Sequence, residues 1–61
     1  MIEHLISISG SILMVYRTHE GDYRYEIILY DGTLHQPDEL YSKANQAKAV
    51  GLESIKTVIG Y

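Results

Sequence analysis

Residues 23–32 read Tyr-Arg-Tyr-Glu-Ile-Ile-Leu-Tyr-Asp-Gly and give the clearest structural signal in the chain. The first eight of these residues are mostly β-branched or aromatic, which favours an extended strand. Alternate side chains of a strand point to opposite faces of a sheet. One face of this strand therefore carries Tyr23, Tyr25, Ile27 and Leu29, and the other carries Arg24, Glu26, Ile28 and Tyr30.

Turn signals flank this strand and predict an antiparallel meander. Asp31-Gly32 predicts a two-residue hairpin turn, because both residues tolerate the positive φ that such turns require. Residues 33–36 then return as a short strand, which Pro37 ends because proline cannot donate to a sheet ladder. Upstream, residues 19–22 (His-Glu-Gly-Asp) form a turn after an extended segment at residues 5–17.

Gly10 interrupts that extended segment and leaves two interpretations open. It marks either a turn between two strands or a bulge within one long strand. The sequence therefore predicts a meander of three strands, or of four.

The region after Pro37 predicts one C-terminal helix packed on one face of the sheet. Ser42 is a candidate N-cap, because its hydroxyl can accept a hydrogen bond from a free amide of the first turn. An alternative start at Asp38-Glu39 lies about one turn earlier. Small and apolar residues then recur every three or four positions, as in a buried helical stripe. The stripe consists of Ala44, Ala47, Gly51, Ile55 and Val58.

Gly51 also leaves two interpretations open. A glycine inside a helix costs roughly 1 kcal/mol relative to alanine, and close packing against the sheet would be a reason to keep it. The helix would then run on to Gly60, with Tyr61 trailing. Alternatively, Gly51 ends the helix as a C-cap and residues 54–59 form a final strand.

The length of the chain predicts a single small α+β domain over residues 1–61. A domain of this size buries only about 60% of the surface of its unfolded chain, so its stability is marginal. The chain has no cysteine, and the spacing of its histidines (His4, His19, His35) does not suit a zinc site. Self-association, most simply as a homodimer, is therefore the expected source of additional stability.

Charge and hydropathy exclude several classes of function. The net charge of −3 does not steer the chain to phosphate backbones, so general nucleic-acid binding is disfavoured. No apolar run approaches the roughly 18 to 20 residues that span a bilayer. Residues 1–9 lack the basic region and long apolar stretch of a signal peptide, so we expect a cytoplasmic location.

Several short segments in the second half of the chain resemble one known family. They are Tyr25 to Tyr30, the turn Asp31-Gly32, Tyr41-Ser42-Lys43-Ala44, and Ala47 followed by Gly51-Leu52-Glu53-Ser54-Ile55-Lys56. This pattern resembles the YegP-like family of small uncharacterised proteins. The resemblance implies a β-β-β-α unit that associates in pairs into one continuous sheet, which for this chain means a homodimer. It implies no catalytic residues.

No motif in the chain predicts catalysis, a cofactor or a metal site. No serine lies in a G-x-S-x-G turn, and the isolated glycines form neither a P-loop nor a G-x-G-x-x-G fingerprint. Asp31 is expected to be a turn residue, and Asp38 and Glu39 are expected to lie near the helix start, where the dipole favours negative charge. We predict a protein that is not an enzyme. A small enzyme would need a pocket that only a dimer junction could enclose.

The predicted interface lies on the face of the central strand that the helix leaves uncovered. Apolar side chains exposed there suggest a protein-binding surface, so we predict an interaction or regulatory protein that self-associates through its sheet and binds a protein partner. The expected interface residues are Arg24, Glu26, Ile28, Tyr30 and Tyr16. The alternative is weak binding of single-stranded nucleic acid, with sheet tyrosines stacking on bases near Arg17 and Arg24.

Overall fold

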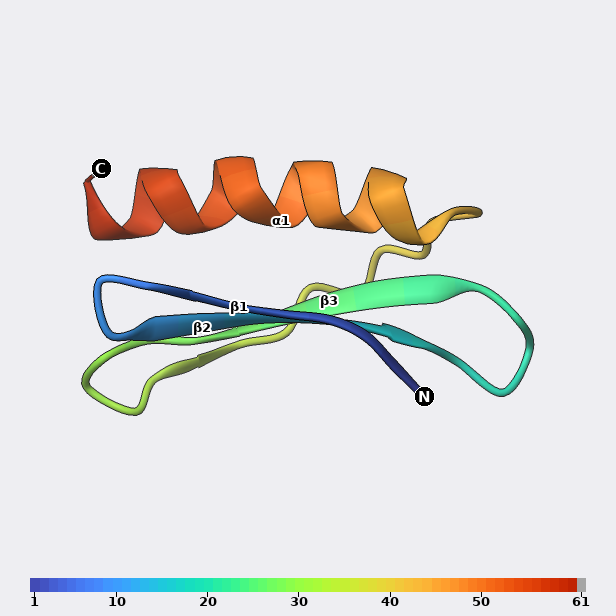
Figure 1. Cartoon of the computed structure of the whole chain (residues 1–61), viewed down its shortest axis with the longest axis horizontal. Helices are drawn as coiled ribbons and strands as arrows, with labels where there is room; N and C mark the ends of the chain where they lie inside the picture. The colour runs from blue at the N-terminus through green and yellow to red at the C-terminus, as the bar shows by residue number, and fades with distance from the viewer. Residues whose placement is uncertain (61) are drawn as a thin grey trace.

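The computed structural model describes residues 1–60 and shows one antiparallel sheet with a helix across one face (Figure 1). The strands follow the chain in the order β1-β2-β3-β4, as a simple meander. This confirms the predicted α+β architecture, with four strands. The elements are β1 (Ile2–Ile8), β2 (Ser11–Arg17), β3 (Tyr23–Ile28), β4 (Leu34–His35) and α1 (Ala44–Ile59).

Gly10 forms a turn, so the segment around it makes two strands rather than one bulged strand. Ile8 of β1 pairs with Ser11 of β2, which leaves Ser9 and Gly10 as a two-residue loop. Both loop residues have positive φ, at 49° and 82°, as expected for the primed turns that suit the twist of a tight hairpin. A register shift between Ile2 and His4 marks a bulge elsewhere, near the start of β1.

The predicted turn at residues 19–22 is confirmed, but the next hairpin differs from its prediction. β3 ends at Ile28 rather than at Tyr30, and β4 covers only residues 34–35. The Leu29 amide donates to the Thr33 carbonyl, and the Gly32 amide donates to the Leu29 carbonyl, both at 2.8 Å. The loop therefore has three residues, 30–32, with only Gly32 at positive φ. A loop of this length typically combines a type I turn with a left-handed glycine.

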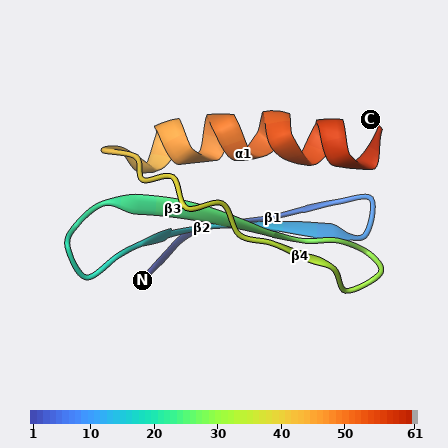
Figure 2. The same cartoon turned by 180° about the vertical axis from the view of Figure 1, so that it is seen from behind.

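The chain between β4 and α1 runs along the outer edge of β3 (Figure 2). Tyr23 and Tyr41 exchange two backbone hydrogen bonds of 2.8 Å, one in each direction. The Arg24 guanidinium donates to the Pro37 carbonyl at 3.1 Å. These contacts hold the residues after Pro37 beside β3 until the chain crosses over to the helix side.

The helix is continuous through Gly51, which rules out a final strand at residues 54–59. Both predicted starts are wrong, because α1 begins at Ala44 and its N-cap is Lys43, which makes no side-chain capping bond. The Ser42 hydroxyl instead contacts the Gln46 side chain at 3.3 Å. Gly60 ends the helix as predicted, in a left-handed conformation with φ of 71°. Tyr61 lies outside the described residues.

The core lies between α1 and the two central strands. Its buried apolar side chains come from all three elements and are Leu13, Val15, Tyr25, Ile27, Ala47 and Ile55. The predicted helical stripe is confirmed at Ala47, Gly51 and Ile55, whereas Val58 is 47% exposed. Ile59 packs against the core at that end of the helix. The helix therefore covers one face of the sheet and leaves the other uncovered.

Candidate interaction surface

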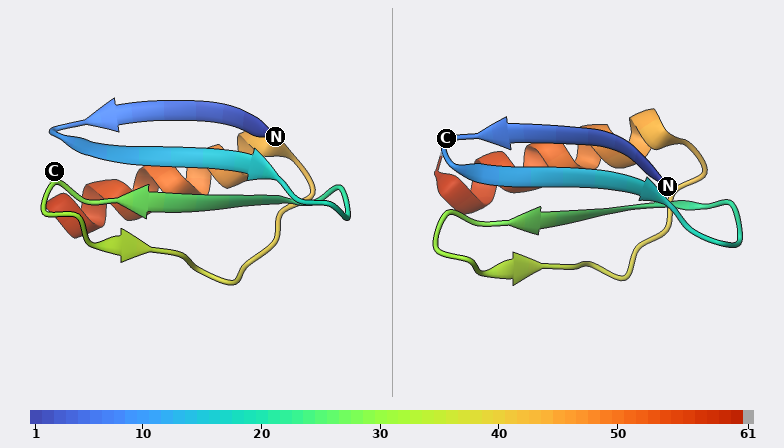
Figure 3. Two further views of the ribbon diagram at one scale, coloured as in Figure 1. Left: turned by 90° about the horizontal axis from the view of Figure 1, so that it is seen from below. Right: turned by 60° about the horizontal axis from the view of Figure 1, so that its bottom comes forward.

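The face of the sheet opposite α1, here called the open face, has no covering layer among the described residues (Figure 3). The strand register places three rows of side chains across it. Ile12 pairs with both Ser7 and Ile28, and Ile28 pairs with Leu34. Met14 lies between Leu5 and Glu26, and Tyr16 lies between Ile2 and Arg24. The open face is therefore built by alternate residues of all four strands.

One end of the open face is apolar. We call it the apolar end, and it consists of Leu5, Ile12, Met14, Ile28 and Leu34. Leu5 is 65% exposed and Leu34 is 50% exposed, even though both belong to regular strands. Ile28, between them, is 41% exposed. Contiguous apolar side chains of this kind on a small domain are typical of an interaction surface.

The other end of the open face is polar. We call it the polar end, and it consists of Tyr16, Arg24 and Glu26, with Gln36 bonded to Glu26. Hydrogen bonding with Tyr16, and then with Gln36, lowers the pKa of the Glu26 carboxyl below its ordinary value. The same bond with Glu26, followed by burial, raises the pKa of the Tyr16 hydroxyl. The amide of Gln36 donates to Glu26 at 3.0 Å. A carboxylate held in this way is a stable acceptor rather than a proton donor or base poised near neutral pH.

Arg24 connects this polar end to the segment after β4. Its guanidinium lies 3.5 Å from the Asp38 carboxylate, in addition to the bond with the Pro37 carbonyl. Its Nε atom is buried without a hydrogen-bond partner among the described residues. Because Asp38 is fully exposed to solvent, this ion pair contributes little to stability. The position of Arg24 is set mainly by the backbone carbonyl.

Four of the five predicted interface residues lie on the open face, and the fifth does not. Arg24, Glu26, Ile28 and Tyr16 lie on neighbouring paired positions of β2 and β3. Tyr30 belongs to the β3–β4 loop, where its amide donates to the Ser11 hydroxyl at 3.1 Å and its side chain is 78% exposed. The prediction placed it on the strand because the alternating pattern continues past the point at which pairing ends.

Several residues of the apolar end are not among the interface residues that the sequence predicts. Ile12 and Met14 alternate with the buried Leu13 and Val15 in β2. Because all four residues are apolar, the sequence shows no alternation that would assign Ile12 and Met14 to the open face. Leu5 and Leu34 join them only through strand pairing, which a single sequence does not reveal. The apolar end therefore exists only because the strand register brings these residues together.

Most of the tyrosines are placed away from the open face. Tyr25 is 4% exposed and lies beneath α1, with its ring centroid 6.2 Å from that of Tyr41. Burial, followed by the charge of Glu39, raises the pKa of Tyr41. Tyr23 packs at the margin of the core. Of the sheet tyrosines, Tyr16 alone belongs to the open face in the part of the chain that the structure describes.

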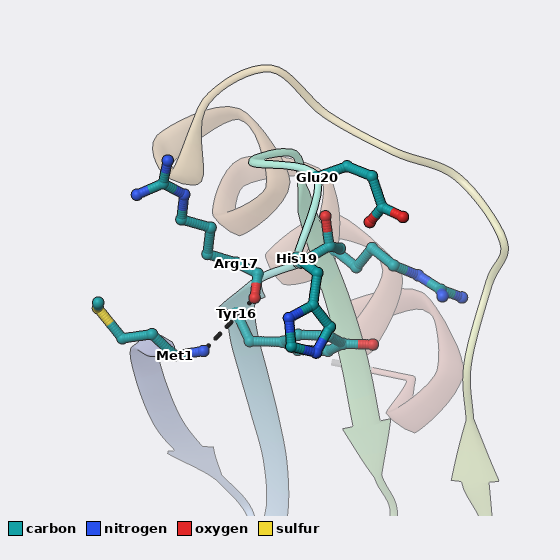
Figure 4. Close-up of a pocket in the computed structure, with 7 residues that line it drawn as sticks. Met1, Tyr16, Arg17, His19 and Glu20 are labelled. Carbon is teal, nitrogen blue, oxygen red and sulfur yellow. Dashed lines mark hydrogen bonds between the residues drawn. The ribbon is translucent and has the colours of Figure 1, made fainter.

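A shallow pocket of about 500 Å³ lies where β2 turns into β3. Met1 reaches it from β1, and its amino group donates to the Arg17 carbonyl at 3.4 Å. In Figure 4 the side chains of Arg17 and Glu20 extend away from His19 rather than toward a common centre. The lining residues are Met1, Tyr16, Arg17, Thr18, His19, Glu20 and Arg24. Their divergence leaves no group of side chains converging on one ligand.

Within residues 1–60, no three His, Asp or Glu side chains gather in a way that could hold a metal ion. The same residues include no helix long and apolar enough to cross a bilayer. The chain matches no protein-family model, and comparison with curated proteins and with solved structures likewise gave no match.

Proposed function

We propose that this chain is a non-enzymatic interaction or regulatory protein that self-associates through its sheet and binds a protein partner with its open face. The observation that carries the proposal is the apolar end of that face. Leu5, Ile28 and Leu34 remain exposed there, although the buried core of the domain contains only six apolar side chains. Exposed apolar surface is retained at such a cost mainly where a partner covers it.

The polar end complements this surface. An apolar patch beside hydrogen-bonded polar groups resembles the core and rim of a protein interface. Glu26 and Arg24 are held by Gln36 and by the Pro37 carbonyl, so they would present fixed charges to a partner. Fixed charges of this kind select a partner and its orientation more than they add affinity. A cytoplasmic location belongs to the same proposal and is checked by cell fractionation.

The first test of the proposal is the solution mass by light scattering across a wide concentration range. We expect a dimer that dissociates on dilution. A monomer at every concentration would remove self-association from the proposal. The dimer would also agree with the resemblance to the YegP-like family, whose units pair into one sheet.

The second test addresses the open face and uses a matched pair of variants. Ile28→Asp places a charge on the apolar end, whereas Val50→Asp places one on α1 at a site of similar exposure, 37% against 41%. Proteins captured from a lysate by the wild type should be lost with Ile28→Asp and kept with Val50→Asp. Equal capture by both variants would contradict a role for the open face. Tyr30→Asp extends the test to the loop.

The alternative of weak single-stranded nucleic-acid binding rests on one observation, which is that Tyr16 pairs with Arg24 on the open face. An aromatic ring beside a guanidinium can stack on a base. Glu26 lies next to both residues and opposes a phosphate backbone. Titration of a labelled oligonucleotide at low salt, with Tyr16→Ala for comparison, tests this alternative. No binding by the wild type would remove it.

A further inference from the structure

The β1 strand forms one edge of the sheet, and its outer side pairs with nothing among the described residues. It is seven residues long and reads Ile-Glu-His-Leu-Ile-Ser-Ile. Natural edge strands are usually protected by lysine, proline, short length or a strong bulge. β1 has no lysine and no proline, and its bulge lies at its first residues. Such an edge is available for pairing with another strand.

The opposite edge of the sheet is protected. β4 covers only residues 34–35, and Pro37 follows it. The segment leading to Tyr41 then runs beside β3 and occupies part of that edge. Pairing of β1 with β4 of another copy would therefore be short. It would also be head-to-tail, which leads to open chains rather than closed assemblies.

The hairpin fixes which backbone groups of β1 point outward. Ile8 and Ser11 flank a two-residue loop, and residues in this position exchange both backbone hydrogen bonds. Pairing of this type alternates along an antiparallel ladder. Ile6 therefore points its amide and carbonyl toward β2, whereas Ser7 and Leu5 point theirs toward the free edge. An added strand would be bonded at these outward positions.

The sequence of β1 is complementary to itself when it is reversed about Leu5. In an antiparallel pair centred there, Leu5 faces Leu5 of the second copy, and outward-pointing residues meet outward-pointing residues. Glu3 faces Ser7 rather than another glutamate, so no like charges are opposed. The remaining pairs are His4 with Ile6 and Ile2 with Ile8. This register spans the whole strand, and the bulge between Ile2 and His4 interrupts the regular ladder only at its first residues.

We propose that β1 pairs antiparallel with β1 of a second copy of this chain, with Leu5 on the two-fold axis. The proposal rests on the self-association proposed above and names the edge and register that produce it. Two four-stranded sheets become one continuous sheet of eight strands, with both helices on the same face. The apolar ends of the two open faces are joined across the axis through Leu5, which enlarges the surface offered to a partner.

Two substitutions at Ser7 test this register, because Ser7 is exposed and has only Ile12 opposite it within the chain. Ser7→Lys places a positive charge opposite Glu3 twice in the dimer, whereas Ser7→Glu opposes two pairs of like charges. We expect the dissociation constant of the Ser7→Glu dimer to be about tenfold above that of the Ser7→Lys dimer. Analytical ultracentrifugation measures both constants.

Cross-linking gives an independent measure, since the chain has no native cysteine. With a short bifunctional maleimide, Leu5→Cys should form a covalent dimer much faster than Ser7→Cys, whose two copies would be separated along the paired strands. If the wild type is a dimer but Ser7→Lys and Ser7→Glu have equal dissociation constants, the β1 register is overturned. Self-association would then take place through another surface. A wild type that stays monomeric overturns both.

Discussion

Gly51 lets α1 lie against the sheet more closely than any other residue would allow. A β-carbon at this position would lie 2.7 Å from Leu13 Cδ1 and 3.2 Å from the ring of Tyr25. We therefore expect Gly51→Ala to destabilise the fold by about 1 kcal/mol. Overpacking of a core costs roughly 1–3 kcal/mol, and this outweighs the gain of up to about 1 kcal/mol in helix propensity. Urea unfolding measures the change.

The control for Gly51→Ala is a helix position with no such contact. Asn45 is exposed on α1, so Asn45→Ala should be neutral or slightly stabilising through propensity alone. If Gly51→Ala raised stability as well, the close approach of the helix would not be limited by Gly51.

Ser9 is the one residue other than glycine with positive φ in the described chain. A left-handed conformation costs most residues roughly 1–2 kcal/mol, whereas asparagine tolerates it better. Ser9→Asn creates the Asn-Gly pair that favours a primed two-residue turn. We expect it to raise the melting temperature by a few degrees, as about 0.5 kcal/mol does in a domain of this size. Ser9→Val should lower it, and a rise with both variants would contradict this account.

Strands β2 and β3 create an acid-sensitive contact where Tyr16 meets Glu26. Hydrogen bonding with Tyr16 holds the pKa of Glu26 below its ordinary value of 4.5, so the unfolded chain binds this proton more readily than the folded chain. The contribution of the contact to stability is therefore present above that value and is lost as the pH falls through the pKa of the folded state. Tyr16→Phe should lower the urea midpoint at neutral pH, and this difference should shrink in acid.

The same contact sets the behaviour in base. The pKa of Tyr16 is raised above its ordinary value of 10.0, so its contribution is full below that value and is lost as the pH rises through the pKa of the folded state. Tyr30→Phe removes a hydroxyl from an exposed loop residue and serves as the control. A difference between wild type and Tyr16→Phe that stayed constant from neutral pH into acid would show that the hydroxyl acts without Glu26.

The elements of the fold were predictable to different degrees. The alternation in β3 and the small-residue stripe at Ala47 and Gly51 are periodic patterns that match the faces buried in the folded protein. The sheet and the helix were therefore predictable from the sequence. The end of the helix at Gly60 and the turn at residues 19–22 were also predicted, whereas the start of the helix and the β3–β4 loop were not. The helix begins at Ala44 because Lys43 before it is still extended, with φ of −135° and ψ of 143°, which leaves Ser42, the better capping residue, one position too early. The β3–β4 loop follows likewise from the pairing of Leu29 with Thr33.

At the scale of the whole molecule, the candidate surface was only partly predictable. The sequence places Arg24, Glu26 and Ile28 on one face of β3, because strand alternation needs no knowledge of neighbours. Leu5 and Leu34 are distant in sequence from β3 and reach its face only through the pairing of β1 with β2 and of β3 with β4. The size of the apolar end is consequently a result of the sheet topology, and no local sequence pattern predicts it.

Stability and assembly should be coupled in a domain with so small a core. If the folded chain dimerises, mass action makes its melting temperature depend on concentration. Above the dissociation constant, each tenfold increase should add about half of 1.4 kcal/mol per chain, or roughly 3–6 °C. Differential scanning calorimetry over a hundredfold range of concentration measures this shift. Ser7→Glu should reduce the dependence while leaving the melting temperature at high dilution unchanged, because Ser7 is exposed and has the uncharged Ile12 opposite it in its own sheet. A melting temperature independent of concentration in the wild type would mean that each chain is stabilised by its own contacts alone.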